Sequence, residues 1–558
     1  MFVIIPLLKT LWKSGRNLLK TTSKCVSGAI LAVICLLCSC EEMITTSPED
    51  YIGPAVEPSQ QNLGAPAATL PPIVAIEPNG PLIITINEAV IISLERNKSL
   101  VVQKLNPQIS RAVEQQALAE FDPDFTAAVS KGRSRAESMP RPGLGSFSVV
   151  TETLSAEAVL SKYFPTGTTV SLNGSTDSLD GSFIDEPFIS SRLGIDVTQP
   201  LLRGFGTTVN LVAVNQAKID TQISQYELRG FVETLVAQVE ETYWNYLLAE
   251  KSIDIYRQSL QIAEEQLKET EERIKVGALA ASELAAAKAE VAFRKQGLIV
   301  AQNTLDQTRL NLVRLLNPGG QEMWNREINL TSEPQTPAIE LEPVKTHVAR
   351  GLQMRPEMNQ SRLLIDRKEL DVVKTRNGLL PQLDLFIAMG KTGYADSFGE
   401  SMRNIFKKNY DVLAGISLDY PPINRSARAQ HQQAKLSRQQ AQEALDNLAQ
   451  LVEVDIRGAY IQIISAEEQV ASAKASRELQ EEKLRVETEK YNVGKSTYLL
   501  VAQAQRDFLQ SQLTEIQAII GFQIAVVELH RFEGTLLLQS GISSPGNVPV
   551  KTSEYTSS

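Results

Sequence analysis

Apolar residues recur at spacings of three and four along two long segments of this 558-residue chain. In the later segment the repeated apolar positions are Leu445, Leu448, Val452, Ile456, Ala459, Ile463, Ala466, Val470 and Ala473. In the earlier segment a set in the same register contains one polar member: Leu228, Phe231, Leu235, Val239, Thr242, Tyr246, Ala249, Ile253 and Tyr256. This spacing predicts α-helices that pack along a continuous seam, as in a coiled coil. Packing alone would explain any single seam.

The two segments are copies in an internal repeat, because a single offset, that between Gly277 and Gly494, aligns them without a gap. A turn motif, Val276-Gly277, returns as Val493-Gly494 in the middle of predicted helix. Because glycine adopts positive φ without steric cost, each motif predicts a turn that ends one helix and lets the next run back. A helix over 207–275 would be about 100 Å long at 1.5 Å per residue, which is too long for one compact domain. The repeat therefore predicts two tall antiparallel helical hairpins.

A pair of shorter helices is predicted ahead of each hairpin. In the first half, Thr85 and Glu88 have the spacing of a capping box at the start of a helix. A second helix follows over about 100–120. The counterpart of this pair in the second half spans about 343–379.

Strands are predicted between the shorter helices and the long ones. In the second half, partial alternation of apolar and polar residues predicts strands over Gln382–Met389 and Val412–Tyr420. Such strands suit a sheet that is wet on one side and apolar on the other. The corresponding region of the first half, 124–199, is longer, and we expect an added hairpin turn near Tyr163–Val170.

Two prolines, Pro200 and Pro421, mark the change from strand to long helix in each half. Proline cannot donate to a sheet ladder and disfavours helix in the residue before it. The order in each half is thus helix pair, strands, proline, long helix, Val-Gly turn and helix. We expect the chain to divide into a signal peptide (1–40), a Pro/Ser-rich tether (41–80), a first repeat (81–320), an inter-repeat linker (321–342), a second repeat (343–537) and a polar tail (538–558).

All four cysteines lie in the first forty residues, at Cys25, Cys35, Cys38 and Cys40. None is left for a disulfide or a thiolate metal site in the body of the chain. Basic residues and an apolar stretch at 29–37 precede Cys40, and the stretch is short for a transmembrane helix. This end resembles a bacterial lipoprotein signal, which implies acylation of Cys40. Plain signal cleavage and an uncleaved anchor are the alternatives.

Composition and motif content argue against several functions. The 55 basic and 65 acidic residues show no basic patch with interleaved aromatics, which argues against nucleic-acid binding. The three histidines, His347, His431 and His530, lack the Cys, Asp or Glu spacing of a metal site or a catalytic triad. No glycine-rich phosphate loop follows a strand. We therefore expect neither an enzyme nor a bound cofactor.

Taken together, these motifs and their duplicated order resemble the TolC-like outer-membrane efflux proteins from about residue 81 to 537. The residues that carry the resemblance are the two Val-Gly turns with Ala287 and Ala504, and the proline exits with the run 201–206. The resemblance implies a mainly α fold with a β-barrel portion, assembled as a homotrimer. Each chain would give about four strands to a twelve-stranded barrel in the outer membrane. The long hairpins would continue it as a trimeric α-barrel tunnel across the periplasm.

The resemblance also implies partners and a role for the turns. Val276, Gly277, Val493 and Gly494 would lie at the periplasmic tip and contact a periplasmic adaptor, or membrane fusion protein, of an inner-membrane pump. The inner helices would form a constriction there, opened by loosening of the second hairpin.

Three residues of the second hairpin are gate candidates by this resemblance. Tyr491 matches a position in the hydrogen-bond network that holds the closed state, although simple packing at a helix end explains it equally well. Ser496 stands where some relatives have a basic partner. Leu500 and Gln503 replace acidic rings of some relatives, so we expect a tip sealed by apolar and neutral packing.

An acidic filter would then have to come from Asp507 or Glu283. For both carboxylates a solvated helix face is the simpler interpretation. The sequence thus favours a passive gated conduit across periplasm and outer membrane, lipid-anchored, within a tripartite efflux or type I secretion-like system. The alternative is a lipid-anchored periplasmic coiled-coil scaffold or adaptor without a pore, which leaves the strand regions with proline exits unexplained.

Overall fold

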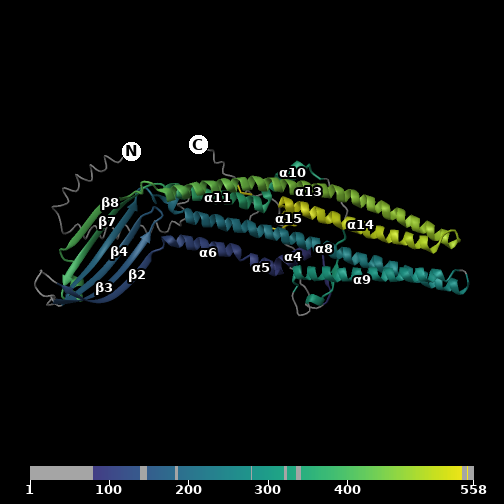
Figure 1. The fold of residues 1–558 in the computed structure, drawn as a ribbon, viewed down its shortest axis with the longest axis horizontal. Coiled ribbons are helices and arrows are strands. Elements are labelled where there is room, and N and C mark those ends of the chain that lie inside the picture. Colours follow the sequence, from purple (N-terminus) through teal and green to yellow (C-terminus); the bar gives the residue numbers. More distant parts are fainter. Residues whose placement is uncertain are drawn as a thin grey trace.

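A computed structural model describes residues 80–138, 147–181, 187–277, 279–318, 323–334, 341–542 and 549–550. The predicted signal peptide with Cys40, nearly all of the tether and most of the polar tail lie outside these residues. The chain is elongated, with a β-sheet at one end and the turns of two long helical hairpins at the other (Figure 1).

The shorter helices form where the sequence predicts them. The first half contains α4 (Ile86–Arg96), α5 (Lys98–Gln103), α6 (Asn106–Leu118) and η2 (Ala119–Phe121). The second half contains α10 (Val344–Met354) and α11 (Pro356–Asn377). The predicted capping box is present, because Thr85 Oγ1 accepts from the Glu88 N–H and the Glu88 carboxylate accepts from the Thr85 N–H.

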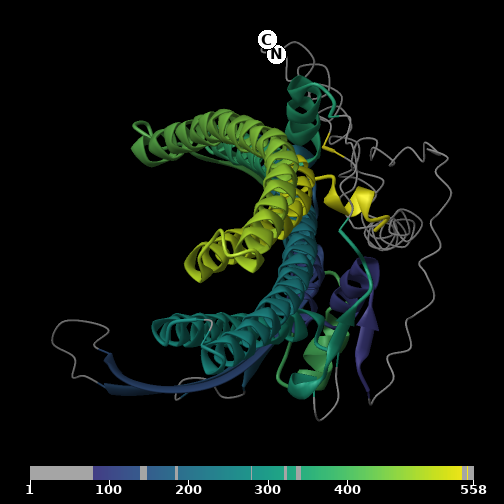
Figure 2. The same cartoon turned by 90° about the vertical axis from the view of Figure 1, so that its right-hand side faces the viewer.

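The two tall hairpins are confirmed. The first consists of α8 (Val212–Lys275) and α9 (Ser282–Leu316), with the short α7 (Thr207–Asn210) ahead of it. The second consists of α13 (Arg425–Asn492) and α14 (Tyr498–Glu533), and α15 (Leu536–Gln539) follows. The 64 residues of α8 correspond to about 96 Å of helix at 1.5 Å per residue. Figure 2 shows that the long helices together trace one curved wall.

The apolar seam of each hairpin faces its neighbours. On α13 the seam residues Val452, Ile456 and Ile463 are buried against residues of α14. The helix α14 itself is long and apolar enough to cross a membrane, with a mean hydropathy of 1.2 in its most apolar window. It packs instead along α13 and α8. A third of this window is buried within the chain, so packing against α13 and α8 accounts for only part of its apolar surface.

One antiparallel sheet gathers the strands of both halves. Its strands are β2 (Asp124–Ser138), β3 (Phe147–Tyr163), β4 (Thr169–Gly181), β5 (Phe188–Pro200), β7 (Gln382–Ala395) and β8 (Tyr410–Asp419). They lie in the order β2-β3-β4-β5-β7-β8. A short helix, α12 (Phe398–Asn404), lies between β7 and β8 in the chain. The strands β2 and β8 form the two edges and do not pair with each other, so the sheet of one chain does not close into a barrel.

The expectation of about four strands per chain is wrong, because this sheet has six. The difference arises in the first half, where the chain turns back after Tyr163 and again reaches the helical end of the sheet through β5. The expected extra hairpin turn is present: the Phe164 N–H donates to Thr168 O and the Gly167 N–H donates to Phe164 O. Both strands joined by this turn pair with neighbours inside the sheet.

The sheet has a mainly apolar face and a mainly polar face, and toward the end away from the helices the apolar face also carries Lys131, Arg133 and Glu152. Directly paired residues of neighbouring antiparallel strands point to the same face. One continuous row of pairs joins Leu160, Leu172, Ile195, Met389 and Val412. The adjacent row, on the opposite face, joins Ser161, Ser171, Asp196, Ala388 and Leu413. This division is the one expected of a sheet with lipid on one side and water on the other.

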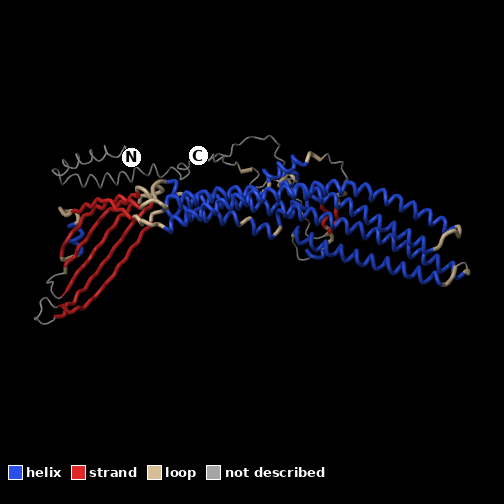
Figure 3. The backbone as a smooth tube through the Cα atoms, turned by 45° about the horizontal axis from the view of Figure 1, so that its top comes forward, coloured by secondary structure: helices blue, strands red, loops and turns tan. Residues whose placement is uncertain are grey.

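Midway along the long helices, a core contains both helix and strand residues. A two-stranded parallel sheet pairs β1 (Leu82–Ile84) with β6 (Ile328–Leu330), so the predicted inter-repeat linker contains a strand, next to the turn η3 (Met323–Asn325). Figure 3 shows this small sheet beside the long helices. Tyr243 of α8 is fully buried there; its hydroxyl donates to Ile84 O at 3.2 Å and accepts from the Ser332 N–H at 3.1 Å.

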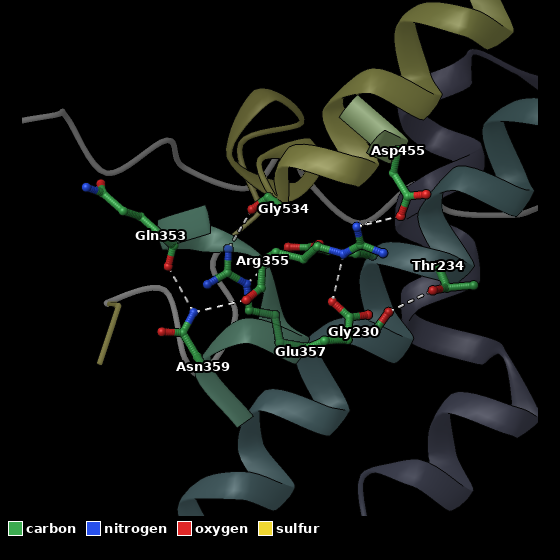
Figure 4. Close-up of polar contacts among 10 residues, drawn as sticks. Gly230, Thr234, Gln353, Arg355, Glu357, Asn359, Asp455 and Gly534 are labelled. Carbon is green, nitrogen blue, oxygen red and sulfur yellow. Dashed lines mark hydrogen bonds and ion pairs between the residues drawn. The ribbon is translucent and has the colours of Figure 1, made fainter. Parts of the chain in front are cut away.

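The corner between α10 and α11 links the second half to its long helix (Figure 4). Arg355 contacts Asp455 of α13 at 2.8 Å and Glu357 at 3.2 Å. The Asn359 side-chain amide closes the corner by donating to Gln353 O and Arg355 O. These bonds fix how the shorter helices join the wall.

Candidate functional site

The two Val-Gly turns lie at the end of the molecule opposite the sheet (Figure 1). Gly277 and Gly494 have φ values of +77° and +72°, so both turns use the left-handed conformation that the repeat predicts. No atom lies within 4 Å of a Cβ placed on either glycine, so the requirement is for the backbone conformation rather than for space. Val276 and Val493 are 78% and 68% exposed. Each turn thus presents a bare apolar side chain at the tip.

Behind the turns a small aromatic cluster joins the two hairpins. Tyr491 lies 6.4 Å from Tyr498 in an edge-on arrangement, and the Arg273 guanidinium of the first hairpin lies over the Tyr491 ring at 5.3 Å from its centre. Tyr498 packs with Ala287 and Ala502 in a buried core. Burial and the nearby Glu290 carboxylate raise the pKa of Tyr498. Tyr491 therefore contacts both hairpins, through stacking rather than a hydrogen bond among the described residues.

A buried ion pair lies close to this cluster and was not predicted. Arg294 of α9 binds Glu290 one turn away at 2.6 Å, and both side chains are at least nine-tenths buried. Arg506 of α14 approaches the same carboxylate at 3.9 Å. The spacing of Glu290 and Arg294 is visible in the sequence as an i,i+4 pair. Its burial could not be read there, because it depends on the second hairpin.

The other gate candidates are exposed side chains of α14 in the single chain. Leu500 is 47% exposed, and Gln503 is also exposed. Among the acidic alternatives, Asp507 binds Lys483 of α13 at 2.7 Å, and Glu283 is partly buried near the first turn. Within one chain these four side chains do not converge on a single site.

Ser496 has a polar role within the second turn. Its hydroxyl donates to Glu487 at 2.9 Å, and Lys490 contacts the same carboxylate at 2.6 Å. These hydrogen bonds lower the pKa of Glu487. The second turn is thereby tied to the end of α13.

The proline exits lie at the helical end of the sheet. Pro200 is the last residue of β5, and Pro421 follows β8 by two residues. After Pro200 the Leu201 N–H still donates to Leu383 O at 2.7 Å, which carries the pairing into the connection to α7. Both prolines thus stand where strand gives way to helix, as predicted.

The three histidines occupy separate structural positions. His347 and His530 lie near Glu533, and His431 contacts Thr375 at 3.1 Å. Among the residues that the structure describes, no group of three His, Cys, Asp or Glu side chains is arranged to hold a metal ion. A cavity of about 460 Å³ adjoins His347 and His530, and its other lining residues include both apolar side chains and the charged Glu342 and Arg350.

An open amphipathic sheet joined to tall helical hairpins defines a class of membrane-embedded channel subunits. Comparison with known proteins agrees with this class. The family model "Outer membrane efflux protein" matches residues 155–318 and 348–535. The chain therefore belongs to the outer membrane efflux protein family.

Individual relatives have low sequence identity to this chain but match most of its length. The cobalt-zinc-cadmium resistance protein CzcC of Cupriavidus metallidurans is 23% identical over 421 residues, which cover 71% of this chain and 92% of CzcC. The Campylobacter jejuni CmeC outer membrane channel has a TM-score of 0.61 at 15% identity, covering 81% of this chain and 86% of CmeC. The outer membrane protein VceC of Vibrio cholerae has a TM-score of 0.60 at 15% identity, covering 80% of this chain and 96% of VceC. These structures share the fold of this chain.

Proposed function

We propose that this chain is the outer-membrane channel component of a tripartite efflux or type I secretion-like system. The observation that carries the proposal is the joining of an amphipathic sheet to two hairpins whose first helices, α8 and α13, are about 100 Å long. The sheet is suited to the outer membrane and the hairpins to the periplasm. The chain would act as a passive gated conduit for substrates delivered by an inner-membrane pump, without catalysis of its own.

The working unit is a homotrimer whose hairpins form a tunnel of twelve helices. An open sheet edge cannot face lipid unpaired, so the sheet must be completed by other copies of the chain. The helix α13 supports the same arrangement, because it exposes apolar residues that another subunit can cover: Leu451, Val454, Ile461 and Leu479. Acylation of Cys40 would add a lipid anchor, with the tether between the anchor and the body.

The two repeats, 81–320 and 343–537, are the structural units of each subunit. Beyond the Val-Gly turns, the helix ends support this division. Asn317 and Gly534 both adopt the left-handed conformation, after α9 and α14 respectively. They are as far apart in the sequence as Gly277 and Gly494. One offset therefore relates both the turns and the helix caps.

The tip is the site of gating and of adaptor contact. Val276, Gly277, Val493 and Gly494 would meet a periplasmic adaptor, because exposed valines offer an apolar contact surface. Tyr491 would hold the second hairpin against the first in the closed state. Leu500 and Gln503 would face the constriction, where neighbouring subunits bring copies of them together.

The test is imaging of the detergent-extracted protein together with its mass from light scattering. We expect a hollow threefold cylinder more than about 100 Å long with three times the mass of the processed chain, and conductance in planar lipid bilayers. A solid rod, or a monomer without conductance, would instead support the lipid-anchored scaffold or adaptor.

A further inference from the structure

The two halves contribute unequal numbers of strands to the sheet. In each half the strand region begins after one proline, Pro123 or Pro381, and ends next to a second proline, Pro200 or Pro421. These landmarks align β2 with β7 and β5 with β8. The strands β3 and β4 therefore form an inserted hairpin in the first half.

The inserted hairpin is an integral part of the sheet. The strand β3 pairs with β2 without interruption from Asp124↔Ser161 to Ser138↔Phe147. The strand β4 pairs with β5 from Thr169↔Thr198 to Leu179↔Phe188. The hairpin thus separates β2 from β5 by two full strands and cannot be folded away without breaking both ladders.

The turn of this hairpin is built into the base of the sheet. The Gly206 N–H donates to Thr166 O at 3.1 Å, and the Asn210 side-chain amide donates to Pro165 O at 3.1 Å. Gly167 has φ +93°, and a Cβ there would lie 2.2 Å from Gly204 O. The turn is therefore fitted against the connection between β5 and α8, at the same level as the other strand-to-helix junctions.

The inserted strands carry their larger apolar side chains on the same face as their neighbours, and on β4 this face continues beyond Leu172 with Gly174, Thr176 and Ser178. Leu154, Leu160 and Leu172 lie on the apolar face and are 45–46% exposed. On the opposite face the same strands carry Glu157 and Asp177, both exposed. The apolar face of β3 and β4 thus continues the band formed by their neighbours. In a membrane it would lie at the same depth.

The width of the sheet matches the width of the helical wall. Six strands spaced about 4.8 Å apart and tilted by about 40° cover roughly 38 Å of a barrel's circumference. Four helices packed about 9.5 Å apart cover roughly 38 Å as well. The edges also suit each other, because six antiparallel strands leave β2 and β8 running in opposite directions. The strand β8 of one copy can therefore pair antiparallel with β2 of the next.

We propose that three copies of this chain close a barrel of eighteen strands, with each β8 edge paired to the β2 edge of a neighbouring copy. The proposal rests on the trimeric channel of the proposed function and assigns the partner of both sheet edges. Barrel diameter grows roughly linearly with strand number, and barrels of 16–18 strands enclose an aqueous channel. The pore would be wide at the membrane, and its narrowest point would lie in the helical tunnel. Glu157 and Asp177 would add carboxylates to the barrel lumen.

The first test is cryo-electron microscopy of the full-length protein in lipid nanodiscs, with the strands counted in cross-section through the membrane. Eighteen strands with β3 and β4 in the wall are expected. A trimeric barrel of twelve strands, with this hairpin outside the wall, would overturn the inference and leave the proposed function standing. Particles that are not trimeric, or that lack a barrel, would instead contradict the proposed function.

A second test measures which faces of the inserted hairpin meet lipid. Spin labels on Ala156→Cys and Leu172→Cys are expected to collide with lipid-soluble oxygen more than with a water-soluble nickel chelate. Labels on the polar face, Ser155→Cys and Ser171→Cys, are the matched controls and should show the reverse. Ala414→Cys on β8 gives the lipid-facing reference. Water-exposed behaviour of the Ala156 and Leu172 labels, with a lipid-exposed Ala414 label, would contradict the inference.

Discussion

The long helices α8 and α13 hold the same position in their repeats and differ in burial. Twenty-one residues of α8 are buried, compared with seven of α13. The reason is position in the chain: α8 packs against α6, α9, α11 and α14, whereas α13 packs against α10, α11 and α14 at the edge of the subunit. The repeat therefore preserves the seam within each hairpin, and the outer surface of α13 is left for another copy.

The same contrast separates two tyrosines at equivalent positions. Tyr243 is fully buried and bonds the small parallel sheet, whereas Tyr460, its counterpart in the second repeat, is partly buried beside His347. One copy of the repeat has thus become the centre of the subunit core. The other has kept a more exposed surface. Matched substitutions in the two copies can measure how much stability this difference carries.

The largest effect is expected from a buried ion pair of α8. Arg229 binds Glu233 at 3.0 Å and Gly534 O at 2.7 Å, with both side chains at most 3% exposed. Arg229→Ala would leave the Glu233 carboxylate buried without its cation and should lower the free energy of unfolding by about 3–5 kcal/mol. The loss of stability is measured by urea titration of the solubilised protein, with unfolding monitored by circular dichroism.

The matched control lies on α13, where Arg457 binds Glu453 at 2.6 Å with both side chains nearly half exposed. Arg457→Ala should cost less than about 1 kcal/mol, because water replaces the lost partner. If the two variants lost equal stability, the difference in burial between α8 and α13 would not affect stability as proposed.

Acid should weaken the second half selectively. Burial by itself would raise the pKa of Glu533, but the side chains of His530, His347 and Thr535 lower it more, to about 2. Its charged form therefore stabilises the fold above pH 4.5, and up to about 3 kcal/mol should be lost as the pH falls from 4.5 to 2. The equivalent position of the first half is Leu316, which does not titrate.

Urea titrations at several pH values between 2 and 5 measure this dependence. Glu533→Gln should flatten it, while Glu453→Gln on exposed α13 should leave it as in the unmodified protein. An unchanged slope in the Glu533→Gln variant would show that other carboxylates cause the acid sensitivity.

A smaller effect is expected from the two equivalent tyrosines. Tyr243→Phe leaves the Ser332 N–H without its hydroxyl partner, while the Ile84 carbonyl still accepts from the Thr331 N–H, and it should cost about 1–3 kcal/mol. Tyr460→Phe should change stability by no more than about 0.5 kcal/mol. The comparison uses the same urea titration. An equal loss of stability in Tyr460→Phe and Tyr243→Phe would contradict this expectation.

A small change in stability, with the clearest functional readout, is expected at the tip. Tyr491→Ala removes the ring contacts with Arg273 and Tyr498, of which the Arg273 contact is worth about 0.5–1 kcal/mol. If Tyr491 holds the second hairpin closed, the variant should raise single-channel conductance in planar bilayers. Ile274→Ala, at the equivalent position of the first hairpin, is the control and should not raise it. Equal conductance of both variants would argue that Tyr491 serves packing alone.

Repeated features were the part of the fold that the sequence could predict. The Val-Gly turns, the seams and the proline exits recur at matching positions, and each has a local physical cause in backbone conformation or helical periodicity. The number of strands was not predicted. The strand β4 consists largely of small and polar residues, so its alternation is weak. The three-residue strand β6 exists only through its pairing with β1.

The contacts of the tip were also beyond sequence reasoning. Arg273 and Tyr491 belong to different repeats and meet only because the hairpins lie side by side. Arg506 approaches Glu290 for the same reason. Periodicity indicates which face of a helix is apolar, whereas the identity of the facing residue depends on the packing of the whole wall.

The pairing of β1 with β6 has a consequence for the order of folding. Leu82 pairs with Ile328, so nearly the whole first repeat lies inside one closed loop. Contacts of such large sequence separation form late, because the entropy of loop closure must be overcome before they add stability. We expect the helical hairpins to form first, because the contacts between their helices begin at a tight turn and span shorter stretches of sequence. If the chain becomes available for folding from its amino terminus, the core around β1 and β6 can be completed only after more than half of the chain is available.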